Sequence, residues 1–196
     1  MARLDQATVD TLVAAHAEWL KSVGTQGTRL SLPDADLQGV DLSGRDLAEA
    51  ELPGANLNGA RLAGTDLAGA NLASANLGGA DLRGARLAKA NLDGAFVGQA
   101  RLDGADLTRA TLVGTDLRGA SLDRTVLRRT VLRRADLRGS TLREAALDRT
   151  VFADVNGGPA NASGATGTVL ADEAGTFLAG LRAAGARDAS AYLPNR

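Results

Sequence analysis

The dominant pattern of the chain is an apolar residue that recurs at every fifth position from Leu37 to Phe152. The spacing gives 24 consecutive units, and leucine occupies 22 of the central positions. Two residues before each centre lies a second residue that is usually small, and it is alanine in 16 of the 24 units. The pattern therefore predicts one large and one small buried side chain in every five residues.

A period of five fits neither an ordinary helix nor a strand. On an α-helix five residues turn about 500°, so successive leucines would lie about 140° apart and spread around the axis. On a strand an odd step places successive leucines on opposite faces. One buried stripe therefore requires units that stack on like units, and we predict a solenoid over residues 31–154.

The units resemble the pentapeptide-repeat family, whose consensus is A(D/N)LXX. ANLNG, TDLAG, ANLAS, ADLRG and ADLTR match this consensus as they stand, and the match covers about 120 of the 196 residues. The resemblance implies an all-β solenoid, a right-handed quadrilateral β-helix in which four units make one coil. The 24 units would then form about six coils and a shaft about 29 Å long.

This architecture fixes which side chains are buried. The central leucine and the small residue two positions before it point inward, and burying one leucine stabilises the fold by about 1.5–3 kcal/mol. A second large residue in each unit would overfill the shaft. Glycine recurs two positions after the centre, where the chain is expected to turn tightly. Asp and Asn before the centre are expected to point outward and to bond nearby backbone groups.

Residues 5–23 are predicted to form an amphipathic helix that covers the open N-terminal end of the solenoid. Asp5 or Thr8 is the expected N-cap. His16 and Trp19 are interpreted as packing residues of this lid. Arg45 occupies an inward slot of the first coil, where a buried charge would be costly. We expect its head to turn towards the lid helix or to pair with an acid there.

The repeat pattern ends at Asp154, and a sequence rich in Gly, Asn, Pro and Ser follows. Helical periodicity returns over residues 168–184, with Thr168 as the expected N-cap and Gly185 after the end. This helix is either a second lid over the last coil or part of a two-fold dimer contact. The predicted organisation has an N-terminal helical cap and lead-in, the β-helix, a linker, and a C-terminal helix with its tail, over residues 1–30, 31–154, 155–167 and 168–196.

Charge is distributed unevenly along the shaft. Residues 32–117 carry twelve acids and seven bases, a net charge of −5, whereas residues 118–149 carry nine arginines and four acids, a net charge of +5. Asp41, Arg61, Asp81 and Arg101 are twenty residues apart and are expected to pair across coils on one face. The candidate acidic partner face consists of Asp36, Asp41, Asp46, Glu49, Glu51 and Asp66. The candidate basic belt around the last coils consists of Arg118, Arg124, Arg128, Arg129, Arg133, Arg134 and Arg138.

Some outward positions are unexpectedly apolar, and such patches usually mark a contact. Phe96 and three valines stand just before a centre, where Asp or Asn is usual. Together with the C-terminal helix, the valines form a candidate contact or dimer patch. Its members are Val126, Val131, Val151, Leu170, Phe177, Leu178 and Leu181.

The sequence contains no arrangement typical of catalysis or metal binding. It has no Cys and a single His, which excludes disulfides, thiolate metal sites and His-paired catalysis. We therefore expect no enzyme and no cofactor. Aromatic residues make up 3% of the chain, too few for stacking on nucleic acid, so direct nucleic-acid binding is not expected. No long apolar run follows Met1, so we expect no signal peptide or membrane span, and a cytoplasmic location.

Two functions remain open. The first is a non-enzymatic interaction module or scaffold that presents solenoid faces to a protein partner. The second is implied by the resemblance, because several pentapeptide-repeat proteins bind type II topoisomerases, DNA gyrase or topoisomerase IV, as proposed mimics of DNA. Some of these proteins protect the enzyme from quinolones or toxins. The basic belt, the leucines at the centres and the lack of inserted loops argue against the second function here.

Overall fold

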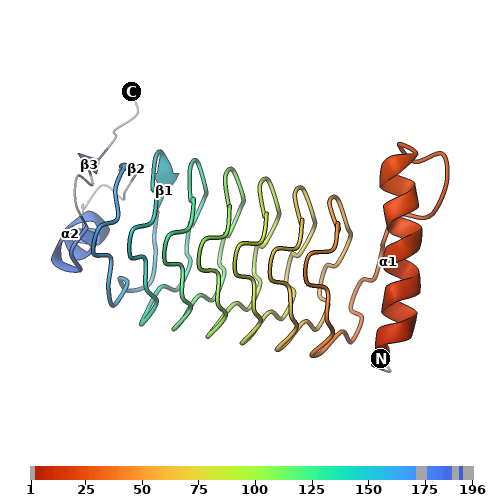
Figure 1. Ribbon diagram of the computed structural model, residues 1–196. Helices are drawn as coiled ribbons and strands as arrows, with labels where there is room; N and C mark the ends of the chain where they lie inside the picture. Colours follow the sequence, from red (N-terminus) through yellow and green to blue (C-terminus); the bar gives the residue numbers. More distant parts are fainter. Residues whose placement is uncertain (1–2, 171–175, 187–189, 192–196) are drawn as a thin grey trace.

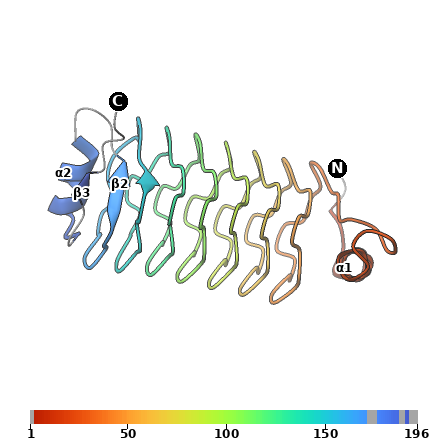
Figure 2. The same cartoon turned by 90° about the horizontal axis from the view of Figure 1, so that it is seen from above.

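The strict repeat of the sequence folds into a straight stack of coils, with one helix at each end (Figure 1). The structure is a computed structural model, and it describes residues 3–170, 176–186 and 190–191. Seen from above, successive coils lie in register along the whole shaft (Figure 2). The helices and strands are α1 (Gln6–Lys21), β1 (Thr150–Val151), β2 (Thr168–Leu170), α2 (Thr176–Ala183) and β3 (Ser190–Ala191).

Parallel backbone bridges join residues that are twenty positions apart, and they divide the surface into four faces. Face 1 starts at Asp36, face 2 at Asp41, face 3 at Asp46 and face 4 at Ser31, and each continues in steps of twenty. Because four units of five residues return to the same face, an outward side chain always lies beside the equivalent one in the next coil. The four-sided section that the resemblance implied is therefore present.

The inward assignment of the leucines and the small residues is confirmed. Leu57 and Leu87 are completely buried, as is Val97, which replaces leucine once. Where the small residue is Thr or Ser, its hydroxyl donates to a backbone carbonyl, as in the 2.7 Å bond from Thr130 to Leu107. Buried polar groups are tolerated only when they are paired in this way. The column therefore accepts hydroxyls in its small slots.

Helix α1 covers the first coil, as the sequence predicted (Figure 1). Asp5 is its N-cap, because its carboxylate accepts the backbone N–H of Thr8 at 2.8 Å. Val9 and Val13 are buried on one side of the helix. The Gln6 amide accepts the N–H of Asp41 and donates to the carbonyl of the same residue, both at 2.9 Å. These two bonds replace those that a preceding coil would make.

Two predictions for the C-terminal region are wrong. The expected linker over residues 155–167 instead continues the coil, because Asn156, Asn161 and Thr166 bridge residues twenty positions earlier. Thr168 is not a helix N-cap, since it begins strand β2, which pairs in parallel with β1. The edge of β1 presents backbone N–H and C=O groups that need hydrogen-bond partners, and any segment that can adopt an extended conformation can supply them. Strand β3 then pairs with the other edge of β2.

Helix α2 lies over the last coil (Figure 1). Leu181 is completely buried and belongs to the main core. The N–H of Ala162 donates to the carbonyl of Ala184 at 2.7 Å, so the segment after α2 supplies the next backbone layer. Gly185 follows the helix with a φ of +94°, as the sequence predicted. Among the described residues no helix has the length and apolarity needed to cross a membrane.

Candidate functional site

The six acids of the candidate acidic partner face do not share a face. Asp36 lies on face 1, Asp41 on face 2, Asp46 and Asp66 on face 3, and Glu51 on face 4. The sixth, Glu49, sits at the turn between faces 3 and 4, with a φ of +61°. The acids encircle the first coils, so they cannot present one continuous acidic surface.

Three of these acids are also neutralised by ion pairs. The carboxylate of Asp41 lies 2.6 Å from Arg61, and that of Asp66 lies 3.0 Å from Arg86. Glu51 lies 2.9 Å from Arg29 in the lead-in segment. Because a paired carboxylate contributes little to a long-range field, the negative potential of this half is weaker than its charge count suggests.

The expected ladder of alternating charge on face 2 forms only in part. Arg61 pairs with Asp41 across coils, but Asp81 pairs with Arg83, which lies two residues along the same unit, at 2.6 Å. Hydrogen bonds from Arg83 lower the pKa of Asp81 despite its partial burial. The side chain of Arg101 makes no ion pair within the described part of the chain. The nearer partner therefore displaces the cross-coil one.

The outward Asp and Asn residues mainly hold their own turns, as predicted. Asp41 accepts the backbone N–H of Ser43 at 3.0 Å, and Asp106 accepts that of Thr108 at 2.9 Å. The Ser43 bonds are the largest cause of the lowered pKa of Asp41. These residues explain the repeat consensus structurally, and they leave few carboxylates free to bind a ligand.

The basic belt separates into paired and unpaired arginines. Arg118 and Arg138 each form an ion pair at 2.6 Å with the Asp two residues before them, and Arg128 lies 3.1 Å from Asp148. Four members form no ion pair with any residue that the structure describes. They are Arg124, Arg129, Arg133 and Arg134.

A row of basic residues runs along the corner between faces 3 and 4, and we call it the basic edge. It consists of Lys89, Arg109, Arg129 and Arg149, which are exposed and twenty residues apart. The backbone N–H of Lys89 donates into the next coil, to the Thr108 carbonyl, at 2.9 Å. Arg109 and Arg129 repeat this bond at the same length. The four corners are therefore stacked, and their side chains leave the shaft in one line.

The basic edge occupies backbone positions that favour glycine. Its four residues have φ values between +57° and +64°, where a side chain costs about 1–2 kcal/mol relative to glycine. At the equivalent corner after face 1, five of the six residues are glycine, and Gln99 is the exception. At the corner of the basic edge, Gly69 is the only glycine between Glu49 and Arg149.

The candidate contact patch is only partly assembled. Val131 and Val151 are bridged neighbours on face 4, and Val126 lies beside Ala146 on face 3. All three valines are half-buried, and they lie on the two sides of the basic edge. Leu181 cannot be a contact residue on the surface, because it is buried in its own chain. The backbone of Leu170 continues the line of Val131 and Val151 on face 4. The side chains of Leu170, Phe177 and Leu178 lie outside the described residues.

Two further residues stand out in the structure: Asp123, which the sequence pattern did not single out, and Phe96, which it marked only as an apolar outward residue. The carboxylate of Asp123 is nearly buried, and it accepts the backbone N–H of Arg143 at 2.9 Å and its Nε at 2.7 Å. Burial raises the pKa of Asp123, but the hydrogen bonds lower it by more, so that the net pKa lies below its ordinary value. Phe96 is 42% exposed and rests against Gly78 and Gly98, where an added Cβ would clash with its ring.

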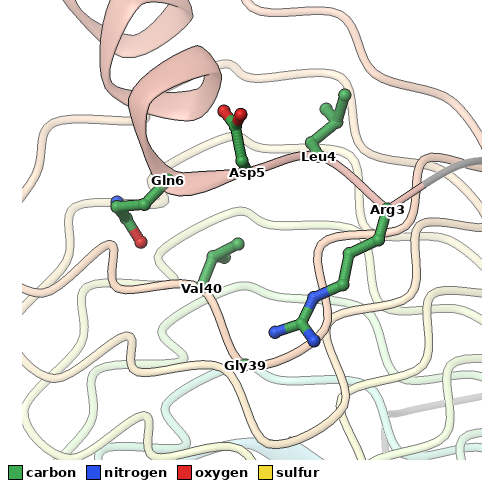
Figure 3. A pocket seen from close by; sticks show the side chains of 6 residues that line it. All are labelled: Arg3, Leu4, Asp5, Gln6, Gly39 and Val40. Atoms are coloured by element: carbon green, nitrogen blue, oxygen red, sulfur yellow. The ribbon is translucent and has the colours of Figure 1, made fainter.

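A pocket of about 390 Å³ lies between the start of α1 and the first coil (Figure 3). Gln6, at one end of the lining, already bonds the backbone of Asp41, and Asp5 already caps α1. The remaining polar side chain, Arg3, points towards Gly39 (Figure 3). The pocket therefore has no nucleophile paired with a base. Over the described ranges no group of three His, Asp or Glu side chains could hold a metal ion.

The repeat geometry agrees with a match to a known family. A family model for pentapeptide repeats matches eight copies within residues 35–154, as overlapping segments that cover more than half of the chain. The chain belongs to the pentapeptide-repeat family. The fold of this family is a right-handed β-helix solenoid, as the resemblance implied. No curated protein matches the chain.

Several solved structures of pentapeptide-repeat proteins are similar to this chain. A trypsin-treated variant of QnrB1, a plasmid-mediated fluoroquinolone resistance protein, has 19% identity and a TM-score of 0.57 over 71% of this chain and 70% of its own. A pentapeptide repeat protein from Nostoc Pcc 7120 has 44% identity and a TM-score of 0.42, over 53% and 79% of the two chains. One from the Arabidopsis thaliana thylakoid lumen has 30% identity and a TM-score of 0.41, over 54% and 70%.

Proposed function

We propose that this protein is a non-enzymatic interaction module, a rod of about six coils that is capped at both ends and presents fixed columns of side chains to a protein partner. The observation that carries the proposal is the twenty-residue register, because each outward side chain is held beside its equivalents by backbone bridges. Because these side chains are already held in place, less conformational entropy is lost when a partner binds them.

The distribution of polar groups also supports binding rather than catalysis. Most outward carboxylates accept turn N–H groups or form ion pairs, and His16 is buried under the lid. General acid–base catalysis requires a titratable group within reach of a substrate proton. The matched family is a repeat family, and within the described residues no group of three His, Asp or Glu side chains could hold a metal ion.

Affinity capture from the native host tests this function. The full chain is immobilised, cross-linked to bound proteins and compared with a variant in which Arg128, Arg129, Arg133 and Arg134 are changed to Glu. A specific partner that reproducibly exceeds the background of an unrelated β-helix protein is the expected result. Failure to enrich any partner across growth conditions would contradict an interaction role.

A second candidate function is binding to a type II topoisomerase, DNA gyrase or topoisomerase IV, with resistance to quinolones or toxins as the outcome. The fold likeness to QnrB1 favours it. The surface favours it less, since the acids encircle the shaft and three of them are paired. A surface that replaces DNA must present a continuous negative field. A gyrase supercoiling assay with and without a quinolone tests this candidate, and neither inhibition nor protection at large excess would eliminate it.

A homodimer through the C-terminal end stays a prediction, as does the cytoplasmic location. Val126, Val131 and Val151 are half-buried residues of the patch that could form such a contact, whereas Leu181 is buried within its own chain. Sedimentation of the full chain and of a chain ending at Asp154 tests the dimer. If both sediment as dimers, the segment with α2 is not part of the contact.

A further inference from the structure

The basic edge is a line of basic side chains whose charged groups are unpaired among the residues that the structure describes. Lys89, Arg109, Arg129 and Arg149 have no ion pair or side-chain hydrogen bond within the described parts of the chain. Of the neighbouring carboxylates, Asp148 is ion-paired with Arg128, whereas Asp106 accepts a turn N–H and keeps its negative charge. The four bases of the edge outnumber this carboxylate, so the net charge along the corner is positive.

We propose that the basic edge, with the valines on its two sides, binds an acidic amphipathic helix of a protein partner. This inference rests on the proposed interaction function and specifies the surface and the chemistry of the partner. The first argument is the composition of the corner. Glycine fits its left-handed backbone without strain, yet four successive coils carry a basic residue there. Glycine at five of six positions after face 1 shows that the fold does not demand side chains at a corner.

The second argument is the spacing of the charges. Coils stack at about 4.8 Å, the separation of neighbouring strands, so the four heads emerge from a line about 14 Å long. An α-helix rises about 5.4 Å per turn, so one Asp or Glu per turn meets one base per coil. The difference accumulates to about 2 Å over three steps. Flexible Lys and Arg stems can absorb this difference.

The third argument is the apolar surface beside the charges. Val126 on face 3 and Val131 and Val151 on face 4 flank Arg129 and Arg149, and all three valines are half-buried. An amphipathic helix carries apolar residues next to its acidic stripe and can bury these valines. A nucleic-acid backbone would instead place hydrated phosphates against valine, and this corner has no aromatic side chain for base stacking. The observations therefore favour a helix over nucleic acid.

Fluorescence anisotropy with a labelled synthetic peptide of about 15 residues tests the proposal. The peptide carries Glu once per helical turn and Leu on both sides of the acidic stripe, and a second peptide has the same composition in scrambled order. The edge variant changes Arg109, Arg129 and Arg149 to Gln in the full chain. The matched control changes Arg101, Arg124 and Arg134 to Gln, which removes the same charge from exposed arginines away from the edge. Arg124 and Arg134 also have a positive φ, so the backbone effect is matched at two of the three positions.

We expect the edge variant to bind the helical peptide about tenfold more weakly than the natural chain, and the control variant to bind it within about twofold. The scrambled peptide should bind more weakly than the helical one. An equal loss in both variants would overturn the proposal, because only net charge would matter. Equal binding of both peptides, or no binding of either, would also overturn it.

Two other occupants of the edge have distinct outcomes. Tighter binding of a single-stranded or duplex oligonucleotide than of the peptide, lost in the edge variant, would overturn the proposal in favour of nucleic acid. A natural chain that sediments as a dimer while the edge variant sediments as a monomer would overturn the proposal in favour of a second copy of this chain. If the host partner is captured equally by the natural chain and the edge variant, the proposed interaction function stands and the assignment of this surface fails.

Discussion

The Nδ1 atom of His16 accepts the backbone N–H of Leu30 at 3.0 Å, and this bond joins helix α1 to the first coil. Since Nδ1 is an acceptor, the proton is on Nε2, which donates to the Ala48 carbonyl at 3.1 Å. The ring is completely buried and stacks on Trp19, with the centroids 5.6 Å apart. The lid is therefore fastened by a neutral histidine.

Protonation of His16 should loosen this lid. Burial lowers the pKa of His16 below its ordinary value of 6.5, although the Ala48 carbonyl and Asp46 oppose the shift. The unfolded chain then binds the proton more readily than the folded chain, so stability is complete above pH 6.5 and falls as the pH drops below it. We expect the Tm to fall between about pH 7 and pH 5.

The control for this prediction is His16→Gln, whose amide can make both bonds and does not titrate. The variant should show a flatter Tm over the same pH interval. The lowered pKa values of Asp116 and Asp136, caused mainly by hydrogen bonds from Arg118 and Arg138, act at lower pH. Their contribution to stability is present above pH 3.8, the ordinary pKa of Asp, and is lost as the pH falls below that value. Identical pH profiles for both chains would contradict the role of His16.

Leu87→Ala should lower the free energy of unfolding by about 2–5 kcal/mol, because it leaves a cavity in a fully buried layer. Urea denaturation measures the change. Val113→Ala, at a half-buried outward position, removes two methyl groups without opening the core and should cost less. Leu87→Asp should prevent folding, and a soluble Leu87→Asp chain with unchanged melting would contradict the inward assignment.

Asp123→Ala should cost about 1–3 kcal/mol, because it leaves the partly buried backbone N–H of Arg143 without its acceptor. Asp148→Ala is the matched control, since Asp148 pairs with Arg128 through exposed side chains. Exposed pairs contribute about 0–1 kcal/mol. Thermal denaturation of both variants at neutral pH compares them. Equal losses would show that the burial of Asp123 does not matter.

Leu181→Ala should cost about 2–5 kcal/mol if α2 seals the last coil as described, because Leu181 is completely buried. Ala183 lies exposed on the same helix, so Ala183→Asp should change the melting temperature little. A Leu181→Ala chain that melts like the natural one would mean that α2 does not close the column.

The sequence predicted the shaft well because a five-residue period has only one way to bury its leucines. The same logic placed Arg45, whose guanidinium lies 3.0 Å from Asp10 of α1, as expected for a charge escaping towards the lid. His16 packs in the lid as interpreted, and its ring is completely buried. No local pattern reveals that its ring would meet the N–H of Leu30, fourteen residues away.

The C-terminal coil could not be predicted, because its sequence no longer follows the five-residue pattern although its backbone continues the coil. Asn156 and Thr166 pair with coils already formed, and such pairing requires an extended chain rather than a particular residue. The helical periodicity of residues 168–184 was overridden at Thr168 for the same reason, since the open edge of β1 takes β2 as a partner. Tertiary pairing outweighed local preference there.

The surface was predicted less well than the core because charges were compared in blocks along the chain. The blocks separated Lys89 and Arg109 from Arg129 and Arg149, although the four stack at one corner. Indexing each turn residue by steps of twenty would have aligned them. Ion pairing also depends on contacts within one unit, such as Asp81 with Arg83, that a count of charges on a face cannot reveal.

All surface assignments depend on the stacking of coils at twenty-residue intervals, and amide hydrogen exchange measured by NMR tests this stacking most directly. The N–H of Leu87 donates to the Asp106 carbonyl in the next coil at 2.7 Å, whereas the N–H of Ala88 has no acceptor among the described residues. We expect slow exchange at Leu87, fast exchange at Ala88 and protection that recurs every five residues along the shaft. Equal exchange at these two amides, or protection with the 3.6-residue period of a helix, would contradict the stacked column.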